Sequence, residues 1–150
     1  MIRVFVPRDS AARSVGADDV AAAIAKHAKH LGLQIVRNGS RGLFWLEPMV
    51  EVDTPSGRVA YGPVSAADVD SLVAAKFHEG GRHALSLGNI ESHPYLKNQE
   101  RLTFARCGIT DPVSVEDYVK HGGFEGLKKA LSMAGAAIVA EVSESGLRGR

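Results

Sequence analysis

Hydrophobic and polar residues follow two periods at the start of this chain, and together they predict an α/β opening. Residues 2–6, IRVFV, are β-branched or aromatic and stop at Pro7, which indicates a short strand. Apolar residues then recur at helical spacing over 18–31, with acidic residues in the first turn and Gly32 just past the end. Residues 33–37, LQIVR, predict a second strand. The opening is therefore a β-α-β unit with two parallel strands.

A hairpin and a second helix are predicted next. MVEV (49–52) and RVAY (58–61) are two short strands joined by DTPSG, which contains the turn residues Pro and Gly. Ser65 is placed to cap a helix, with Asp68 in the capping-box position. The apolar stripe of this helix consists of Val69, Leu72, Val73 and Phe77. The order β-α-β-β-β-α predicts a small α/β fold of the thioredoxin kind.

The second half of the chain has a different pattern. Residues 82–100 lose periodicity and contain Gly88 and Pro94, so we expect a connector that runs over the surface. Three segments with helical spacing follow, DPVSVEDYVKHGG with Ser114 as a cap, GFEGLKKALSM and AAIVAEVSESG. The expected division is an α/β domain over 1–88, a connector over 89–113 and a helical segment over 114–150.

Composition and charge exclude two classes of partner. The chain is 45% hydrophobic and 23% charged, and no apolar run approaches the roughly 20 residues needed to span a bilayer. Its net charge is +1, and residues 1–140 hold no basic cluster that could neutralise a row of phosphates, so nucleic acid is not an expected partner. The N-terminus MIRVFVPRDS lacks the features of a secretory signal, which favours a cytoplasmic location.

No catalytic constellation is identified from the sequence. Cys107 is the single cysteine, so neither an internal disulfide nor a cysteine-held cluster is expected, and a small semi-buried side chain is the favoured interpretation. His27 and His30 are three apart on one helix, but no second pair or acid completes a metal site. Asp9 and Ser10 follow the first strand without an identifiable base, so a turn is favoured over a nucleophile.

The chain ends on SGLRGR, in which Gly146 and Gly149 flank Arg148 and Arg150 follows. Glycines allow a backbone to approach a phosphate or flavin closely, and arginines supply charge-assisted donors. The alternative is a frayed basic tail, which composition alone favours because the run matches neither common nucleotide-binding pattern. The run closes no helix or strand, so we expect the sequence to be a fragment.

Three stretches in the same order resemble one protein family. GADDV (16–20), NGSRGLFWLEPMVEV (38–52) and AYGPVSAADVDSLV (60–73) are similar to a thioredoxin-like [2Fe-2S] ferredoxin domain. Residues 95–131 resemble the lead-in of a flavin subunit, and SGLRGR resembles the start of its glycine-rich loop, SGLRGRGGAGFPTG. The family is that of the flavin-bearing, NADH-oxidising (diaphorase) subunits. The resemblance is strongest to the β subunit of soluble NAD-dependent molybdenum or tungsten formate dehydrogenase, and the family includes the complex I flavoprotein subunit.

The resemblance implies a fold, an activity and partners. It implies a thioredoxin-like domain followed by a short helical lead-in to a missing flavin domain. The full-length subunit would bind FMN, NAD and a [4Fe-4S] cluster and pass electrons from formate to NAD, whereas residues 1–150 alone would bind none of them and be inactive. Gly146, Arg148, Gly149 and Arg150 would form the incomplete edge of the FMN and NAD loop. The implied partners are the molybdenum or tungsten α subunit and a small [2Fe-2S] γ subunit.

The same resemblance implies that an iron-sulfur cluster has been lost from the first domain. Thioredoxin-like ferredoxins hold their cluster with a C-x4-C pair after the first strand and a C-x3-C pair in a later loop. These positions fall on Pro7, Ala12, Ser40 and Phe44, none of which is a ligand for such a cluster. We expect Phe44 and Trp45 to be buried in the corresponding space, which would contribute about 1.5–3 kcal/mol per side chain.

Residues 1–88 are therefore expected to serve mainly as a cluster-free docking domain. Two alternatives remain at this point. The chain could belong to the flavin subunit of an NAD-linked hydrogenase or of complex I, or it could be a stand-alone binding module without enzymatic activity. The sequence leaves open whether formate or hydrogen supplies the electrons, which metal the partner holds, the oligomeric state, and whether the chain is truncated.

Overall fold

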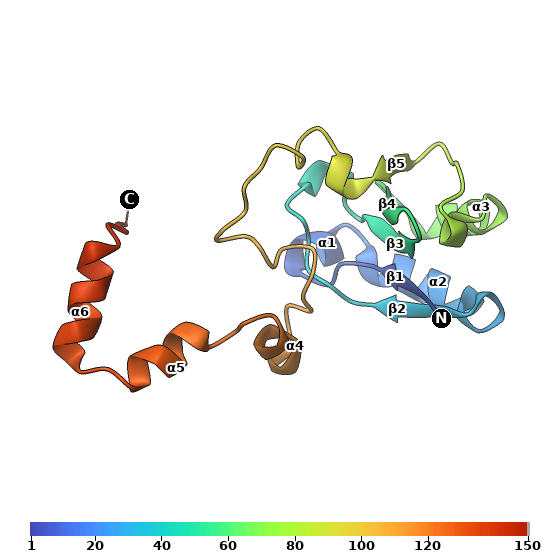
Figure 1. Ribbon diagram of the computed structural model, residues 1–150. Coiled ribbons are helices and arrows are strands. Elements are labelled where there is room, and N and C mark those ends of the chain that lie inside the picture. Colours follow the sequence, from blue (N-terminus) through green and yellow to red (C-terminus); the bar gives the residue numbers. More distant parts are fainter. Residues whose placement is uncertain (150) are drawn as a thin grey trace. The chain divides into compact units, whose positions relative to one another are not determined.

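The computed structural model describes residues 1–149. Contacts divide the chain into two compact units, Met1–Ser114 and Val115–Arg150. The first unit carries a sheet with helices, and the second carries helices alone (Figure 1).

The first unit is built on a five-stranded mixed sheet in the order β2-β1-β3-β4-β5. Its strands are β1 (Ile2–Phe5), β2 (Leu33–Val36), β3 (Val50–Thr54), β4 (Gly57–Tyr61) and β5 (Ser86–Asn89). β1 and β2 pair in parallel, and the other neighbours pair antiparallel. The predicted β-α-β opening and the predicted hairpin are both confirmed.

The main hydrophobic core lies between the sheet and the helices of the first unit. These are α1 (Ser10–Ser14), α2 (Ala17–Leu31) and α3 (Val69–Ala74). Val20 and Ile24 of α2 pack in one cluster with Val4 and Val52 of the sheet. The capping box predicted at Ser65 is present before α3, and its hydrogen bonds hold the pKa of Asp68 below its usual value. These elements follow from local signals in the sequence.

The opposite face of the sheet is covered by loops. Side chains alternate along β3, so Val50 and Val52 enter the main core while Glu51 and Asp53 face the other way. On that second face a smaller apolar cluster is formed by Leu43, Met49, Ala60, Ile90 and Leu96. The loop residues of 38–49 and the segment after β5 therefore supply the cover of this face.

The expectation that residues 82–100 form a surface connector is wrong in its middle part. Residues 86–89 form β5, and Ile90 and Leu96 after it are buried. The strand was missed because SLGN has no β-branched residue and contains Gly88, and its pairing with β4 is a contact between residues distant in sequence. The first compact unit thus includes the segment 89–113, whereas the domain limits proposed from the sequence remain predictions.

The second unit consists of three short helices, as predicted: α4 (Val115–Lys120), α5 (Glu125–Leu131) and α6 (Gly135–Glu144). Tyr118 and Phe124 meet edge to face with ring centroids 5.0 Å apart, and Lys129 pairs with Glu141 between α5 and α6. Leu131, like most of the other large apolar side chains of these helices, is exposed, whereas Ile138 is half-buried. Among residues 1–149, no helix is both long and apolar enough to cross a membrane.

Candidate functional site

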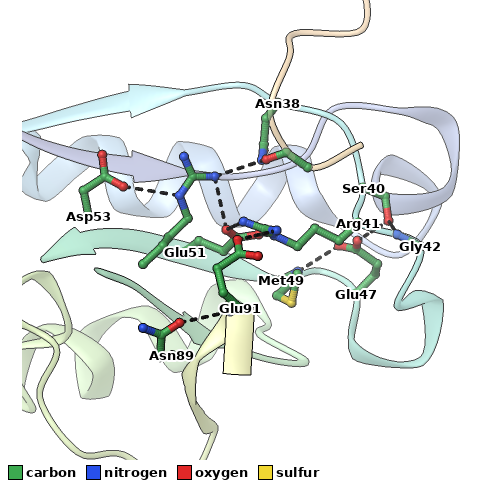
Figure 2. A network of polar contacts seen from close by, with 12 residues as sticks. Asn38, Ser40, Arg41, Gly42, Glu47, Met49, Glu51, Asp53, Asn89 and Glu91 are labelled. Carbon is green, nitrogen blue, oxygen red and sulfur yellow. Dashed lines mark hydrogen bonds and ion pairs between the residues drawn. The ribbon is translucent and has the colours of Figure 1, made fainter. Parts of the chain in front are cut away.

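The loop that carries Ser40 is held closed by hydrogen bonds to two carboxylates. The Ser40 hydroxyl donates to Glu47 Oε1 at 2.6 Å, and the other Glu47 oxygen accepts from the Met49 backbone N at 2.9 Å (Figure 2). The Ser40 backbone N donates to Asp9 Oδ1 at 3.0 Å, and the Gly42 N donates to the Ser40 hydroxyl at 3.0 Å. The Ser40 side chain is therefore fully used in closing this loop.

Beside this loop lies a buried network of ion pairs on the second face of the sheet. Arg41 Nε and Nη2 donate to the two oxygens of Glu51 at 2.8 and 2.9 Å, and both side chains are buried (Figure 2). Arg58 also reaches Glu51, at 3.3 Å, and its guanidinium lies 3.6 Å from the centre of the Phe5 ring. Burial alone would lower the pKa of Arg41, but pairing with Glu51 and Glu91 raises it. The Arg41 guanidinium is thus kept charged and fixed in place.

The same network holds the segment around Gly108 against the sheet. The Gly108 carbonyl accepts from Asn38 Nδ2 at 2.8 Å and from Arg58 Nη1 at 3.1 Å. The Gly39 backbone N donates to the Thr110 carbonyl at 2.9 Å. Two segments about 70 positions apart are thereby joined. Their shared role is to build the walls of a cavity.

That cavity has a volume of about 630 Å³, within the range of about 300–1,000 Å³ that is usual for ligand pockets. Its walls come from three segments of the first unit: Asp9, residues 39–44 and residues 95–112. The lining residues are Asp9, Gly39, Ser40, Arg41, Gly42, Phe44, Tyr95, Gln99, Arg101, Phe104, Arg106, Cys107, Thr110 and Pro112. Aromatic and apolar groups form most of the wall, and a few polar groups converge on it.

The structure brings together two of the four positions that were predicted to correspond to cluster ligands. Ser40 and Phe44 both line the cavity, whereas Pro7 and Ala12 are buried elsewhere and do not. The expectation that Phe44 and Trp45 are buried is wrong, because they are 62% and 58% exposed. The loop directs both rings to the rim of the cavity, where Trp45 packs edge to face on Tyr95 at 5.1 Å. The space between the loop and residues 95–112 is therefore open and not filled by aromatic side chains.

The side chains at these four positions do not fit an iron-sulfur cluster. A [2Fe-2S] cluster of the ferredoxin type is normally held by four thiolates, and the chain has one cysteine. Ser40 is committed to Glu47, and Phe44, Pro7 and Ala12 have no ligand atom in their side chains. Cys107 lines the cavity and is half-buried. One thiol cannot replace four.

The residues predicted to edge a flavin loop lie in the second unit. A Cβ added at Gly146 or at Gly149 would have no neighbouring atom within 4 Å, and Leu147 between them is 83% exposed. Gly146, Arg148 and Gly149 are all exposed. Arg150 lies outside the described residues. Their assignment to the edge of the FMN and NAD loop stays a prediction.

Two histidines outside the cavity, His27 and His83, each contact the side chain of a nearby residue. His27 Nε2 lies 3.0 Å from Asp70 Oδ1, but within residues 1–149 no group of three or more potential ligands is placed to hold a metal. His83 Nδ1 accepts from the Leu85 backbone N, so its Nε2 carries the proton and donates to the Ser71 hydroxyl. Ser71 in turn donates to a backbone carbonyl. This histidine therefore cannot act as a base towards Ser71.

The fold is that of the thioredoxin-like [2Fe-2S] ferredoxins. The ferredoxin of this type from Aquifex aeolicus superimposes with a TM-score of 0.53 at 22% identity, over 63% of this chain and 96% of that one. A cysteine-to-serine variant of the same ferredoxin gives a TM-score of 0.50 at 24% identity, over 59% of this chain and 100% of that one. At such identities the likeness concerns the fold alone.

Two curated relatives match shorter parts of the sequence. The NADP-reducing hydrogenase subunit HndC of Solidesulfovibrio fructosivorans is 48% identical over 54 residues, which are 36% of this chain and 11% of that protein. One subunit of the NADH-quinone oxidoreductase of Streptomyces coelicolor is 54% identical over 37 residues, 25% of this chain and 8% of that protein. The matched segments span about a tenth of each relative or less. No protein-family model matches the sequence.

The network around Glu51 was not foreseen from the sequence, although a signal for it exists. Residues 50–53 read Val-Glu-Val-Asp, so one face of this strand is apolar and the other acidic. Glu51 is only 1% exposed, which shows that the acidic face is covered. The partners Arg41 and Arg58 could not be assigned because pairing depends on how the loop folds back over the sheet.

The Glu47 carboxyl makes the free energy of unfolding depend on pH, and the direction of this dependence follows from the burial of the carboxyl. Burial raises the pKa of the Glu47 carboxyl, against the opposing hydrogen bonds from Ser40 and Met49. Its stabilising contribution is therefore fully present below the unfolded pKa of about 4.3 and is lost as the pH rises through the higher folded value. A Glu47→Gln variant stays neutral, so its free energy of unfolding relative to the native chain is expected to rise with pH across this window and then level off.

Urea unfolding at a series of pH values measures this difference. Glu144→Gln, at an exposed position in α6, controls for the loss of one negative charge. A relative stability of Glu47→Gln that stays flat or falls between about pH 4.3 and neutrality would contradict the assignment.

Proposed function

We propose that this chain is the N-terminal part of the β (diaphorase) subunit of a cytoplasmic NAD-dependent formate dehydrogenase, and that its first unit is a cluster-free docking domain. The observation that carries the proposal is a ferredoxin-type fold whose predicted ligand positions hold Pro7, Ala12, Ser40 and Phe44. Because Ser40 closes its own loop through Glu47, the loop is held without a cluster, and this domain would not transfer electrons. A retained fold without its cluster favours a structural role.

The remaining machinery would belong to the full-length subunit and its partners. FMN, NAD and a [4Fe-4S] cluster would be bound by the full-length subunit, and FMN would pass a hydride to NAD. Formate would be oxidised in a molybdenum or tungsten α subunit, with a small [2Fe-2S] γ subunit between them. Both curated relatives are named as subunits of oxidoreductases that use NADP or NADH, which supports this class of assembly.

A second candidate is the corresponding subunit of an NAD(P)-linked hydrogenase. It is favoured by the 48% identity to HndC, a subunit of an NADP-reducing hydrogenase, over 54 residues. Purification of the assembled complex and assay of NAD reduction with formate or with hydrogen as the donor separates the two. Reduction with formate alone supports the first candidate, and reduction with hydrogen alone supports the second.

The docking role is tested by removing residues 1–114, the first compact unit, from the full-length subunit co-expressed with the α and γ subunits. The truncated subunit is expected to lose co-purification with its partners in size-exclusion chromatography while still binding FMN. Unchanged assembly would refute the docking role.

Iron analysis of residues 1–150 after reconstitution with iron and sulfide tests the loss of the cluster, since stoichiometric iron with visible absorbance would contradict it.

A further inference from the structure

The rim of the cavity carries an unusual concentration of exposed aromatic side chains. Phe44, Tyr95 and Phe104 line the cavity and are 62%, 52% and 65% exposed, and Trp45 packs on Tyr95. These four are drawn from only nine Phe, Tyr and Trp residues in the chain. Leu102, between the aromatic positions of this segment, is 90% exposed. Exposed aromatic side chains gathered around a cavity are characteristic of protein interaction sites, whose centres are enriched in aromatic residues.

One arginine of the cavity, Arg101, has no carboxylate partner in the part of the chain that the structure describes. Three arginines and one aspartate line the cavity: Arg41, Arg101, Arg106 and Asp9. Arg41 is neutralised by Glu51, and the Asp9 carboxylate accepts from the Ser40 backbone N. Arg101 donates to the Gln99 side chain and to the Arg41 carbonyl. A carboxylate on an incoming group would therefore be attracted to the Arg101 guanidinium.

We propose that this aromatic-rimmed cavity is the docking site for a segment of a partner protein that presents an aromatic side chain flanked by carboxylates. The aromatic side chain enters the cavity between Phe44 and Phe104, and a flanking carboxylate pairs with Arg101. The proposal rests on the proposed function to the extent that the partner is another subunit of the same complex. A protein segment is favoured over a small ligand because a molecule confined to the cavity would leave Trp45 and Leu102 uncovered.

Trp45 makes the proposal directly measurable, because it is the only tryptophan and lies at the rim. The chain is titrated with the capped peptide DEFED while Trp45 emission is followed. The peptide is expected to give a saturable blue shift, with an affinity about tenfold or more above that of DEAED, which lacks the aromatic ring, and of KKFKK, which reverses the charge. The affinity for DEFED is expected to fall as salt is added.

Matched variants locate the binding site on the chain. Phe104→Ala and Arg101→Gln are each expected to weaken DEFED binding, the first about tenfold and the second by a few-fold with loss of most of the salt dependence. Val15→Ala and Arg82→Gln, at exposed positions of the first unit outside the cavity, are expected to leave the affinity unchanged. Circular dichroism verifies that each variant is folded before titration.

Several outcomes overturn the proposal. Absence of a shift with DEFED, equal affinity for the three peptides, or preference for KKFKK would each refute the docking site. A full shift with free phenylacetate at the same concentrations would assign the cavity to a small carboxylic acid instead. A dimer in sedimentation velocity that Phe104→Ala abolishes would assign the surface to a second copy of this chain.

The peptide titration tests the docking site, and the assembly experiment tests the proposed function, so either can be refuted without the other. The titration uses residues 1–150 alone, whereas assembly is measured in the co-expressed complex. Selective DEFED binding together with unchanged assembly after removal of residues 1–114 would refute the proposed function and leave the docking site standing. Loss of assembly without selective peptide binding would refute the docking site and leave the proposed function standing.

Discussion

Replacement of Glu51 by alanine is expected to lower the free energy of unfolding by about 3–5 kcal/mol, because the buried Arg41 guanidinium loses its buried partner and keeps only the exposed Glu91. Arg41 is 6% exposed and makes two hydrogen bonds to Glu51, at 2.8 and 2.9 Å. Arg58 loses the same carboxylate. Urea unfolding followed by far-ultraviolet circular dichroism measures the loss.

Glu91 provides the matched control for this substitution. It pairs with the same arginine at 2.8 Å, but its side chain is 67% exposed. Glu91→Ala is therefore expected to cost no more than about 1 kcal/mol. Similar losses of unfolding free energy for Glu51→Ala and Glu91→Ala would show that burial does not raise the cost of breaking the ion pair. If Glu51→Ala does not fold, Glu51→Gln retains one acceptor and permits the same comparison.

A double-mutant cycle separates the pair from its surroundings. Arg41→Ala removes the buried cation, so the combination with Glu51→Ala is expected to cost less than the sum of the two single changes. Strict additivity would mean that the two side chains do not stabilise each other. The cycle matters for the site because Arg41 also lines the cavity, and its carbonyl accepts from Arg101.

The parts of the fold that the sequence predicts correctly are those with a local signal. The strand at residues 2–6, the helix that ends at Gly32 and the capping box at Ser65 each depend on residues a few positions apart. β5 lacks such a signal, because its four residues become a strand only by pairing with β4. Local patterns therefore predict four of the five strands, including the edge strand β2, but not the edge strand β5.

The site could be predicted only in part, for a similar reason. The resemblance to thioredoxin-like ferredoxins places Ser40 and Phe44 at two predicted cluster-ligand positions of one loop. In the structure both residues line the cavity. The resemblance does not predict where the Phe44 ring points, since that depends on residues 95–112 across the cavity. The expected burial of Phe44 assumed that an apolar side chain occupies the position of a missing cluster. The loop instead places this ring at the rim, where it is available to a partner.

Gly108 joins the network to the cavity wall, and Gly108→Ala is expected to lower the free energy of unfolding by about 2–4 kcal/mol. Gly108 has a φ of +80°, which disfavours any side chain, and an added Cβ would lie 2.2 Å from Arg41 Cγ. Arg41 can move aside only if its guanidinium gives up the hydrogen bonds to Glu51. The substitution therefore displaces either Arg41 from Glu51 or the Gly108 carbonyl from its two donors.

Gly42→Ala distinguishes the clash from backbone strain. Gly42 has a similar φ of +86°, but nothing lies within 4 Å of an added Cβ, so its cost is limited to strain of about 1–2 kcal/mol. The excess cost of Gly108→Ala over Gly42→Ala measures the contact with Arg41. In the Gly108→Ala variant, amide exchange at Gly39, whose N–H donates to the Thr110 carbonyl, should accelerate as residues 107–112 detach from the loop. Equal costs for the two variants, with unchanged exchange at Gly39, would show that Gly108 does not couple the buried ion pairs to the wall of the cavity.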